Sequence, residues 1–307
     1  MSRDKSIDIL KGFAIILMVF GHCPSIVRPL IFSFHMPLFF FVSGYLYKDK
    51  TIKQLLKSTL YKVILPYLIT CFIVWFFKYI ASGQESWGLN ILIGNGENVG
   101  PLWFLVCYAV SQIYFWLGLK SNRNLFASVL LILWICAYFY RENFGLLPFN
   151  ILNAIPATFC MFLGYQLKDI EFCKKIFTKR NIAMMLVTAL LSSVKGTLTM
   201  ASFGYPFWAI SIIAAMYVTF VCYWIINKYC LTSKWGGISI FGTNSLFFLC
   251  AHSVDYLLNI SPSVCNYFFG EYGENTIVLF PTKMLFIVLS FLLLSRIRII
   301  KNIYLIK

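Results

Sequence analysis

Residues Ile7–His22, IDILKGFAIILMVFGH, form an apolar run that carries an aspartate, a lysine and a histidine. Ionisable side chains are costly inside a bilayer, so each one in such a run needs a partner or a role. Asp8 and Lys11 interrupt the start of the run and no small-residue cleavage site ends it, which is unlike a cleaved signal peptide. We therefore expect residues 7–23 to form a retained membrane-spanning helix.

The composition of the whole chain extends this interpretation. Of 307 residues, 60% are hydrophobic, 19% aromatic and 12% charged, and the mean hydropathy is +0.79, whereas about a quarter of the residues of a soluble domain are charged. The sequence predicts an all-α, polytopic bundle of transmembrane helices in one integral domain, residues 1–307, without internal repeats. About ten runs have the length of a spanning helix, and they cover residues 7–23, 31–47, 64–80, 101–119, 125–140, 150–167, 181–196, 205–227, 236–258 and 276–297.

The basic residues lie mainly on one side of this predicted bundle. With the N-terminus in the cytoplasm, 21 of the 26 lysines and arginines fall in cytoplasmic segments. By the positive-inside rule, this asymmetry predicts an even number of spans and both termini in the cytoplasm. Topology and contact with anionic membrane lipids then account for most of the net charge of +15, and no nucleic-acid partner is expected. A minority of these side chains remains for a polyanionic cytosolic ligand.

The ten cysteines stand singly, mostly inside apolar runs, with no CxxC pair and no metal-ligand spacing. We interpret them as small core residues, and we expect neither a disulfide framework nor a metal site. Cys23 follows His22 directly, but adjacent residues point about 100° apart on a helix. A Cys–His nucleophilic pair is therefore disfavoured.

The predicted topology brings all three histidines of the chain to one depth. His22 ends the outward-running first span, and His35 begins the returning second span. His252 lies fifteen residues after Gly237, about 22 Å along a straight ninth span at 1.5 Å per residue, which is the same outer level. A shared layer favours a common site. The alternative is that each ring is a polar residue satisfied in a helix–helix contact.

One face of the first span is expected to link Lys11, near the cytoplasm, to the histidine layer. The eleven-residue interval from Lys11 to His22 is almost three helical turns, so both side chains project from one helix face about 16 Å apart. Asp8, three residues before Lys11, is placed to pair with the ammonium group. Snorkelling of Lys11 to the lipid headgroups is the alternative.

The stretch Phe32–Gly44, FSFHMPLFFFVSG, places a histidine and a proline at the start of the second span. Proline suits the first turn of a helix because its missing N–H costs nothing there, so we expect His35 at the helix mouth, facing a cavity. Ser43 and Gly44 follow about two turns deeper. They serve either close helix packing or the approach of a ligand to the backbone.

Further polar residues stand in the later spans. Ser245 and His252 are seven residues apart in the ninth span and share a face, and Asp255 lies three residues beyond on roughly the same side. Asp255 either holds the imidazole in one tautomer or is an interfacial acid at the helix end. Asn244 is expected to bond to a neighbouring helix. Trp103, two residues into the fourth span, is either an interfacial anchor or part of a site.

Five segments carry a resemblance to a known family: IDILKGFAIILMVFGH, FSFHMPLFFFVSGYLYK, a basic stretch that ends in LPYL, GPLWFL and GTNSLFFLCAH. Together they resemble the acyltransferase-3 family of integral membrane acyltransferases, closely from Ile7 to Leu105 and again in the ninth span. The resemblance implies a ten-helix core in the bacterial cytoplasmic membrane. It also implies transfer of an acyl group, usually acetyl from cytosolic acetyl-CoA, to a hydroxyl of a cell-surface sugar or glycan or of its lipid-linked precursor.

By this resemblance, Lys11 and His22 take the places of the family's essential basic residue and histidine, His35 is the histidine of the second block, and Trp103 belongs to the Pro-x-Trp-x-Leu motif. The family often has arginine in the place of Lys11. It also commonly carries an arginine pair after the second span, where this chain has only lysines, such as Lys57 and Lys62. Lysine keeps the charge but lacks the bidentate fork for a phosphate.

These residues suggest a reaction. A neutral imidazole can take the proton of a hydroxyl as the hydroxyl attacks a thioester carbonyl, and we assign this role of general base to His22. His35 would orient the acceptor hydroxyl, stabilise the oxyanion or share in proton transfer. The nucleotide of the donor is expected against Lys11, Lys57 and Lys62, and an acyl-histidine intermediate is an alternative to direct transfer.

A transporter or export protein for a small molecule or polysaccharide is the rival class. Buried histidines and a lysine also suit proton relays. Carriers more often have repeated halves with helices broken in corresponding places, and the sequence shows neither feature. The enzyme class is therefore favoured.

Overall fold

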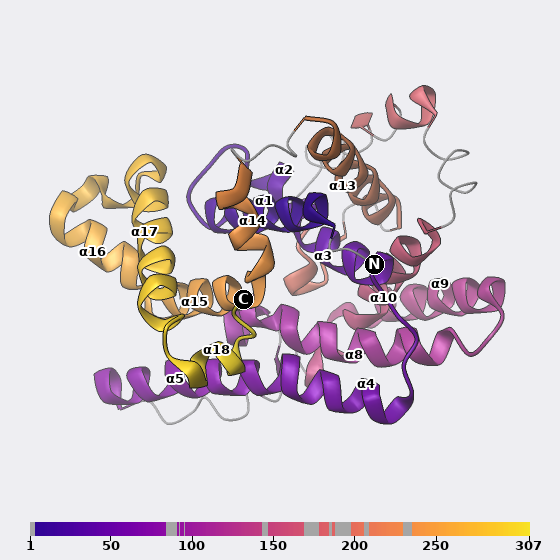
Figure 1. Cartoon of the computed structure of the whole chain (residues 1–307), viewed down its shortest axis with the longest axis horizontal. Coiled ribbons are helices and arrows are strands. Elements are labelled where there is room, and N and C mark those ends of the chain that lie inside the picture. The colour runs from indigo at the N-terminus through magenta and orange to yellow at the C-terminus, as the bar shows by residue number, and fades with distance from the viewer. Residues whose placement is uncertain are drawn as a thin grey trace.

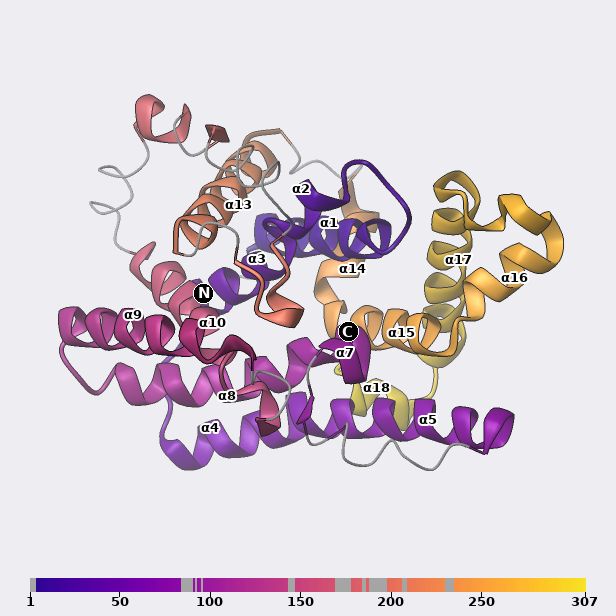
Figure 2. The ribbon, with the colours of Figure 1, turned by 180° about the vertical axis from the view of Figure 1, so that it is seen from behind.

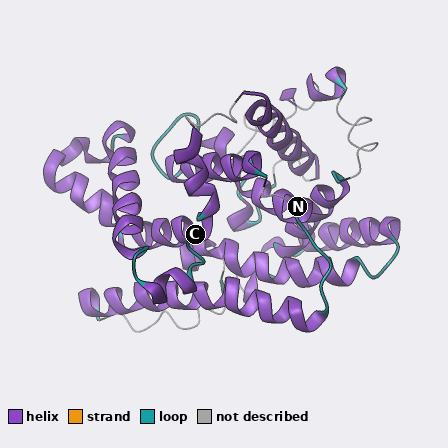
Figure 3. Ribbon diagram, viewed as in Figure 1, coloured by secondary structure: helices purple, strands orange, loops and turns teal. Residues whose placement is uncertain are grey.

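The computed structural model describes residues 4–83, 91, 93–94, 96–142, 147–168, 178–183, 186–187, 198–205, 209–229 and 235–307. Figure 3 shows these residues as helices joined by loops, and within these ranges the sole β pairing is one isolated bridge between Thr199 and Gly204. The prediction of an all-α protein is confirmed.

The helices form a bundle with the first helix near its centre. Figures 1 and 2 show α1, α3 and α14 in the middle, the long rod of α4 and α5 along one edge beneath α8, and α16 with α17 at one end. The helices are α1 (Lys5–Gly21), α2 (Arg28–Phe32), α3 (His35–Tyr45), α4 (Ile52–Thr59), α5 (Leu65–Ser82), α7 (Gly96–Val99), α8 (Trp103–Gly118), α9 (Arg123–Phe139), α10 (Ala154–Gln166), α13 (Ala209–Tyr229), α14 (Gly236–Thr243), α15 (Ser245–Leu258), α16 (Ile260–Phe269), α17 (Thr276–Leu294) and α18 (Arg298–Ile303).

Among the residues that the structure describes, four helical segments are long and apolar enough to cross a membrane. They are Ile52–Ala81, Gly100–Gly118, Ile210–Tyr229 and Thr276–Leu294, and α14 with α15 would make a fifth if that bent pair is one span. Other predicted spans are shorter in the structure: α1 has 17 residues and α3 has 11. The predicted seventh span, 181–196, falls mostly outside the described residues. Ten spans and two cytoplasmic termini thus remain predictions.

The basic stretch before the third predicted span is helical, where the sequence suggested a loop. Thr51 caps α4 through a capping box with Gln54, and a π-helical turn over Leu60–Ile64 joins α4 to α5. Pro66 follows directly, and because proline lacks an N–H and clashes with the preceding turn, a local π adjustment lets the helix continue past it. Lys53, Lys57 and Lys62 therefore stand on a helix.

Glycines bring α1 and α14 into backbone contact. A Cβ built on Gly242 would lie 1.7 Å from the Asp8 carbonyl oxygen, and a Cβ built on Gly12 would lie 2.1 Å from the Ile238 carbonyl oxygen. The later residue of α14 thus meets the earlier residue of α1, so the two helices run antiparallel. The sequence-based expectation that residues 236–243 run outward beside the first span is wrong.

The chain turns by nearly a right angle immediately after α14. Asn244 has φ −109° and ψ 29°, outside the helical region, and α14 and α15 are bent by 77° there. The predicted straight ninth span, 236–258, is therefore two helices. Hydropathy alone does not reveal this break, because both pieces are apolar.

A second glycine pair joins α3 to α10. A Cβ on Gly44 would lie 1.8 Å from the Met161 carbonyl oxygen, and one on Gly164 would lie 2.0 Å from the Phe41 carbonyl oxygen. Small residues allow this close approach in membrane-type helix packing. Gly44 is therefore a packing residue, one of the two roles considered for it, and its neighbour Ser43 is left facing a cavity.

Candidate active site

One face of α1 lines two adjoining cavities. Lys11, Ile15 and Met18 line a large cavity of about 490 Å³, and Met18 and His22 line a smaller one of about 80 Å³. These four residues follow one another at intervals of three or four, which is one helical stripe. Asp8 and Lys11 form the predicted ion pair, with 3.2 Å between the Lys11 Nζ and the Asp8 Oδ1.

The three histidines gather at the far end of this stripe. The ring centroids of His22 and His252 are 5.0 Å apart. The ring of Phe32 lies between His22 and His35, with its centroid 5.5 Å from that of His22 and 5.1 Å from that of His35. His22, His35 and Trp103 all line the small cavity. The histidines share one layer, although α15 brings His252 there after a bend and not along the straight helix that we expected.

His35 has a defined tautomer. α3 begins at His35 with Pro37 in its first turn, and the Nδ1 of His35 lies 2.8 Å from the carbonyl oxygen of Ile31. A carbonyl can only accept, so Nδ1 carries the proton and donates it. In the neutral ring, Nε2 is then an acceptor with a free lone pair.

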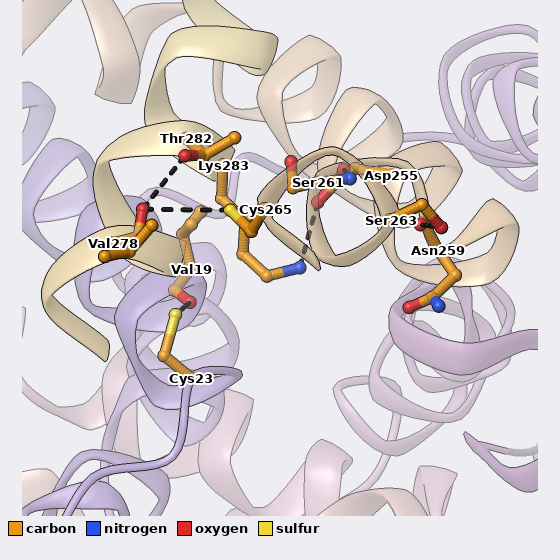
Figure 4. A network of polar contacts seen from close by, with 10 residues as sticks. All are labelled: Val19, Cys23, Asp255, Asn259, Ser261, Ser263, Cys265, Val278, Thr282 and Lys283. Atoms are coloured by element: carbon orange, nitrogen blue, oxygen red, sulfur yellow. Dashed lines mark hydrogen bonds and ion pairs between the residues drawn. The ribbon is translucent and has the colours of Figure 1, made fainter. Parts of the chain in front are cut away.

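Asp255 does not orient His252. Its Oδ2 lies 2.9 Å from the Nζ of Lys283 on α17, and its Oδ1 accepts a hydrogen bond from the Ser261 backbone N at 2.8 Å (Figure 4). Both charged groups are buried, and a buried pair of this kind needs such additional hydrogen bonds to offset its desolvation. The proposed Asp255–His252 contact is wrong because Lys283, distant in sequence, takes the carboxylate.

His252 is left in an unusual state. Its side chain is fully buried, and neither ring nitrogen has a hydrogen-bond partner in the part of the chain that the structure describes. Buried polar groups normally find partners. The ring of His22 lies 5.0 Å away between centroids, so His252 belongs to the histidine layer as a supporting residue.

Lysines gather at the opposite end of the large cavity. Lys11, Lys48, Lys50 and Lys62 line it, and the described part of the lining contains no carboxylate. Lys57 is exposed on α4 and does not line it, contrary to our expectation. The pKa of Lys50 is lowered mainly by burial and to a smaller extent by the charge of Lys62. This end of the cavity therefore favours an anion.

Sequence reasoning missed Lys48 and Lys50 among these residues. Each stands in a short connection between two helices, where lysines are common because such connections are usually exposed to solvent. The concentration of lysines between residues 48 and 62 was a usable signal. The π-helical turn that aims Lys62 toward the cavity was not readable.

A polar cluster stands in the middle of the large cavity. The Ser43 hydroxyl lies 2.9 Å from the Tyr108 hydroxyl and accepts a hydrogen bond from the Gln112 Nε2 at 3.0 Å. Ser43, Tyr108, Gln112 and Ser245 all line the cavity. The two residues of α8 could have been found from their spacing, since a tyrosine and a glutamine four residues apart in an apolar helix share one face.

Asn244 serves the fold. Its Nδ2 donates to the Ile240 carbonyl oxygen at 3.0 Å, and its Oδ1 accepts from the Lys307 backbone N at 2.8 Å. The bond was expected to go to a neighbouring helix, whereas it goes to Lys307 in the non-helical segment after α18. Asn244 does not line either cavity, so among the expected supporting residues of this helix pair only Ser245 does.

The fold and the two cavities define a helical membrane protein in which buried histidines adjoin a lysine-lined chamber. The family model for an acyltransferase domain matches residues 4–297, and the chain belongs to this acyltransferase-3 family. No group of three or more His, Cys, Asp or Glu side chains suited to a metal ion occurs among the described residues.

Two curated relatives are similar to part of the chain. The nodulation protein NolL of Mesorhizobium japonicum is 29% identical over 140 residues, which are 40% of this chain and 38% of that protein. NolL of Sinorhizobium fredii is 28% identical over 156 residues, 43% of this chain and 42% of that protein. The match thus spans about two fifths of the length of these relatives. No solved structure matches the chain.

Proposed function

We propose that the protein transfers an acetyl group from cytosolic acetyl-CoA to a hydroxyl of a cell-surface sugar, glycan or lipid-linked precursor, in a bacterial cytoplasmic membrane. The observation that carries this proposal is that Lys11 and His22, on one face of α1, line two cavities that share Met18 and Met36. Membership of the acyltransferase family supports the reaction class over the alternative of a transporter.

The large cavity suits the donor. Its volume of about 490 Å³ is within the usual range of ligand pockets, about 300 to 1,000 Å³. Lys11, Lys48, Lys50 and Lys62 would bind the phosphates as point charges. The hydroxyls and amide of Ser43, Tyr108 and Gln112 stand further along, where the amides of a pantetheine arm would find partners.

The small cavity suits the reaction. His22 accepts the proton of the acceptor hydroxyl while the hydroxyl oxygen forms a bond to the carbonyl carbon of the thioester. The carbon–sulfur bond then breaks, and the proton held by His22 passes to the departing thiolate, which leaves as the free thiol of CoA. No further reactant is needed, and His22 returns to its neutral form.

The hydrogen bond of His35 narrows its role. A neutral His35 with its proton on Nδ1 cannot donate from Nε2, so it does not stabilise an oxyanion there. Its free Nε2 can accept a hydrogen bond from the acceptor hydroxyl and so orient it before attack. Trp103 offers an indole N–H, which can only donate, and Thr199 offers a hydroxyl on the same cavity, and both suit a hydroxylated acceptor.

The test uses membranes that contain the protein and their own acceptors. Acetyl-CoA labelled in the acetyl group should release free CoA thiol and label surface glycan in equal amounts. His22→Ala should reduce both to background, whereas Cys23→Ser, a change at the next position of the chain, should leave both near the level of the unmodified protein. Substrate movement across the membrane without thiol release would instead favour a transporter.

A further inference from the structure

The two cavities meet at a pair of methionines. Among the described residues, Met18 on α1 and Met36 on α3 line both the lysine-lined cavity and the histidine-lined cavity. Both side chains are buried, with 1% and 8% of their surface exposed. Ile15, one turn before Met18, lines the large cavity alone, and His22, one turn after it, lines the small cavity alone. One side chain from each helix therefore forms the partition between the two cavities.

Methionine is suited to a partition that yields to a small group. Its side chain is unbranched, turns about three bonds and makes adaptable contacts, so it can change rotamer without moving the helix. A β-branched residue at the same place would be stiff. Gly44 and Gly12 hold the backbones of α3 and α1 against their neighbours, so the side chains can yield while the walls stay fixed.

We propose that Met18 and Met36 determine which acyl group reaches His22, and that they admit a short, uncharged one. The proposal rests on the proposed function, since it names the donor class for the same reaction. The methionines are specificity-determining residues here, and no proton or bond passes through them.

The small cavity sets the size limit. Its volume of about 80 Å³ is about one sixth of the 490 Å³ of the large cavity, so it suits a small group. An acetyl group adds three heavy atoms to this space, whereas a butyryl group carries two more methylenes beyond its carbonyl, which would have to fit inside the small cavity against Met18 and Met36. Apolar pockets distinguish a single methylene by about 10- to 200-fold.

The charge of the small cavity sets a second limit. Its described lining contains no lysine or arginine, although four lysines line the large cavity on the other side of the methionines. A carboxylate moved past the methionines would lose water and the four lysines, which is costly. The cations nearest the small cavity do not line it: Arg28 stacks on the Phe32 ring and Lys283 is paired with Asp255. Succinyl and malonyl groups should therefore be refused even where their length is tolerated.

The experiment compares donors in membranes that contain the whole protein. Acceptor-dependent thiol release is measured with acetyl-CoA, butyryl-CoA and succinyl-CoA for the unmodified protein, Met18→Ala and Met36→Ala. Met216→Ala is the matched control, because Met216 is also a buried methionine but lines neither of the two cavities; it lines a different pocket between α1, α3 and α13.

The unmodified protein should favour acetyl over butyryl by at least about tenfold in kcat/KM. Met18→Ala and Met36→Ala should each raise the butyryl-to-acetyl ratio by about tenfold, while Met216→Ala leaves it unchanged. Succinyl-CoA should stay a poor donor throughout. An unchanged ratio in both truncations, or an equal change in Met216→Ala, would overturn the proposal while leaving acyl transfer intact. If the unmodified protein released thiol from none of the donors, the proposed function itself would fail, and this inference with it.

Discussion

The contact between α1 and α14 makes a strong prediction for Gly242→Ala. The new Cβ would lie 1.7 Å from the Asp8 carbonyl oxygen and 2.8 Å from the Gly12 nitrogen. Ordinary contacts of a Cβ begin near 3.4 Å, so α14 would have to move away from α1 by roughly 1.7 Å. The atoms in the way are backbone atoms and cannot rotate aside. We therefore expect Gly242→Ala to lower the free energy of unfolding by about 3 kcal/mol, the upper end of the usual cost of overpacking.

The shift should also affect the site. α15 starts directly after the bend at Asn244 and carries His252 to within 5.0 Å of the His22 ring. A displacement of about 1 Å in a catalytic arrangement can cost roughly 100-fold in rate. Acyl transfer by Gly242→Ala should therefore fall by about two orders of magnitude in whatever protein remains folded.

A matched control stands in the same helix. A Cβ built on Gly237 meets no atom within 4 Å, and alanine is a better helix former than glycine by about 1 kcal/mol. Gly237→Ala should therefore be as stable as the unmodified protein or slightly more so. The assay is thermal unfolding of the detergent-purified protein, followed by the loss of its monodisperse peak in gel filtration. Equal unfolding temperatures for the two variants would refute the close contact between α1 and α14.

Three further predictions concern the buried charges and the site. Lys283→Met should destabilise the protein by about 3 to 5 kcal/mol because it leaves the buried Asp255 carboxylate unpaired, and adding Asp255→Leu should recover most of the loss in the same thermal assay. His35→Asn should lower kcat by about 100-fold with little change in KM for acetyl-CoA. The asparagine amide can still donate to the Ile31 carbonyl oxygen, but it offers no lone pair at the position of Nε2. An unchanged kcat would contradict the orienting role of His35. Lys50→Gln and Lys62→Gln should each raise KM for acetyl-CoA but not for acetyl-pantetheine, which lacks the nucleotide. Because burial and the charge of Lys62 lower the pKa of Lys50, Lys50 loses its charge at a lower pH than an ordinary lysine. KM for acetyl-CoA should therefore rise as the pH increases on the alkaline side, and it should rise less in Lys50→Gln.

The sequence predicted the class of fold and the stripe on α1 because both depend on local periodicity. A high apolar content with few charges leaves little choice but helices in a membrane-type protein. The intervals between Asp8, Lys11 and His22 fix a shared face on any α-helix, whatever surrounds it. The ion pair of Asp8 with Lys11 follows from the same spacing.

The features that the sequence did not predict depend on contacts between distant segments. The direction of α14 and the bend at Asn244 follow from glycines of two helices that meet, which hydropathy does not encode. No motif in the sequence marks Lys283, yet it is buried against Asp255, 28 positions earlier. The three histidines do share a layer, but the straight-helix calculation that led to this prediction was wrong for His252.

The central claim is that a donor bound beside the lysines gives its acetyl group to an acceptor at His22, on the other side of Met18 and Met36. Sealed membrane vesicles of known orientation test it most directly, with labelled acetyl-CoA supplied only on the side of the membrane where Lys11 lies. The label should appear in glycan on the opposite face, CoA thiol should be released on the donor face, and His22→Ala should abolish both while CoA still binds. Transfer that requires acetyl-CoA on the acceptor face, or that proceeds at the normal rate in His22→Ala, would contradict the claim.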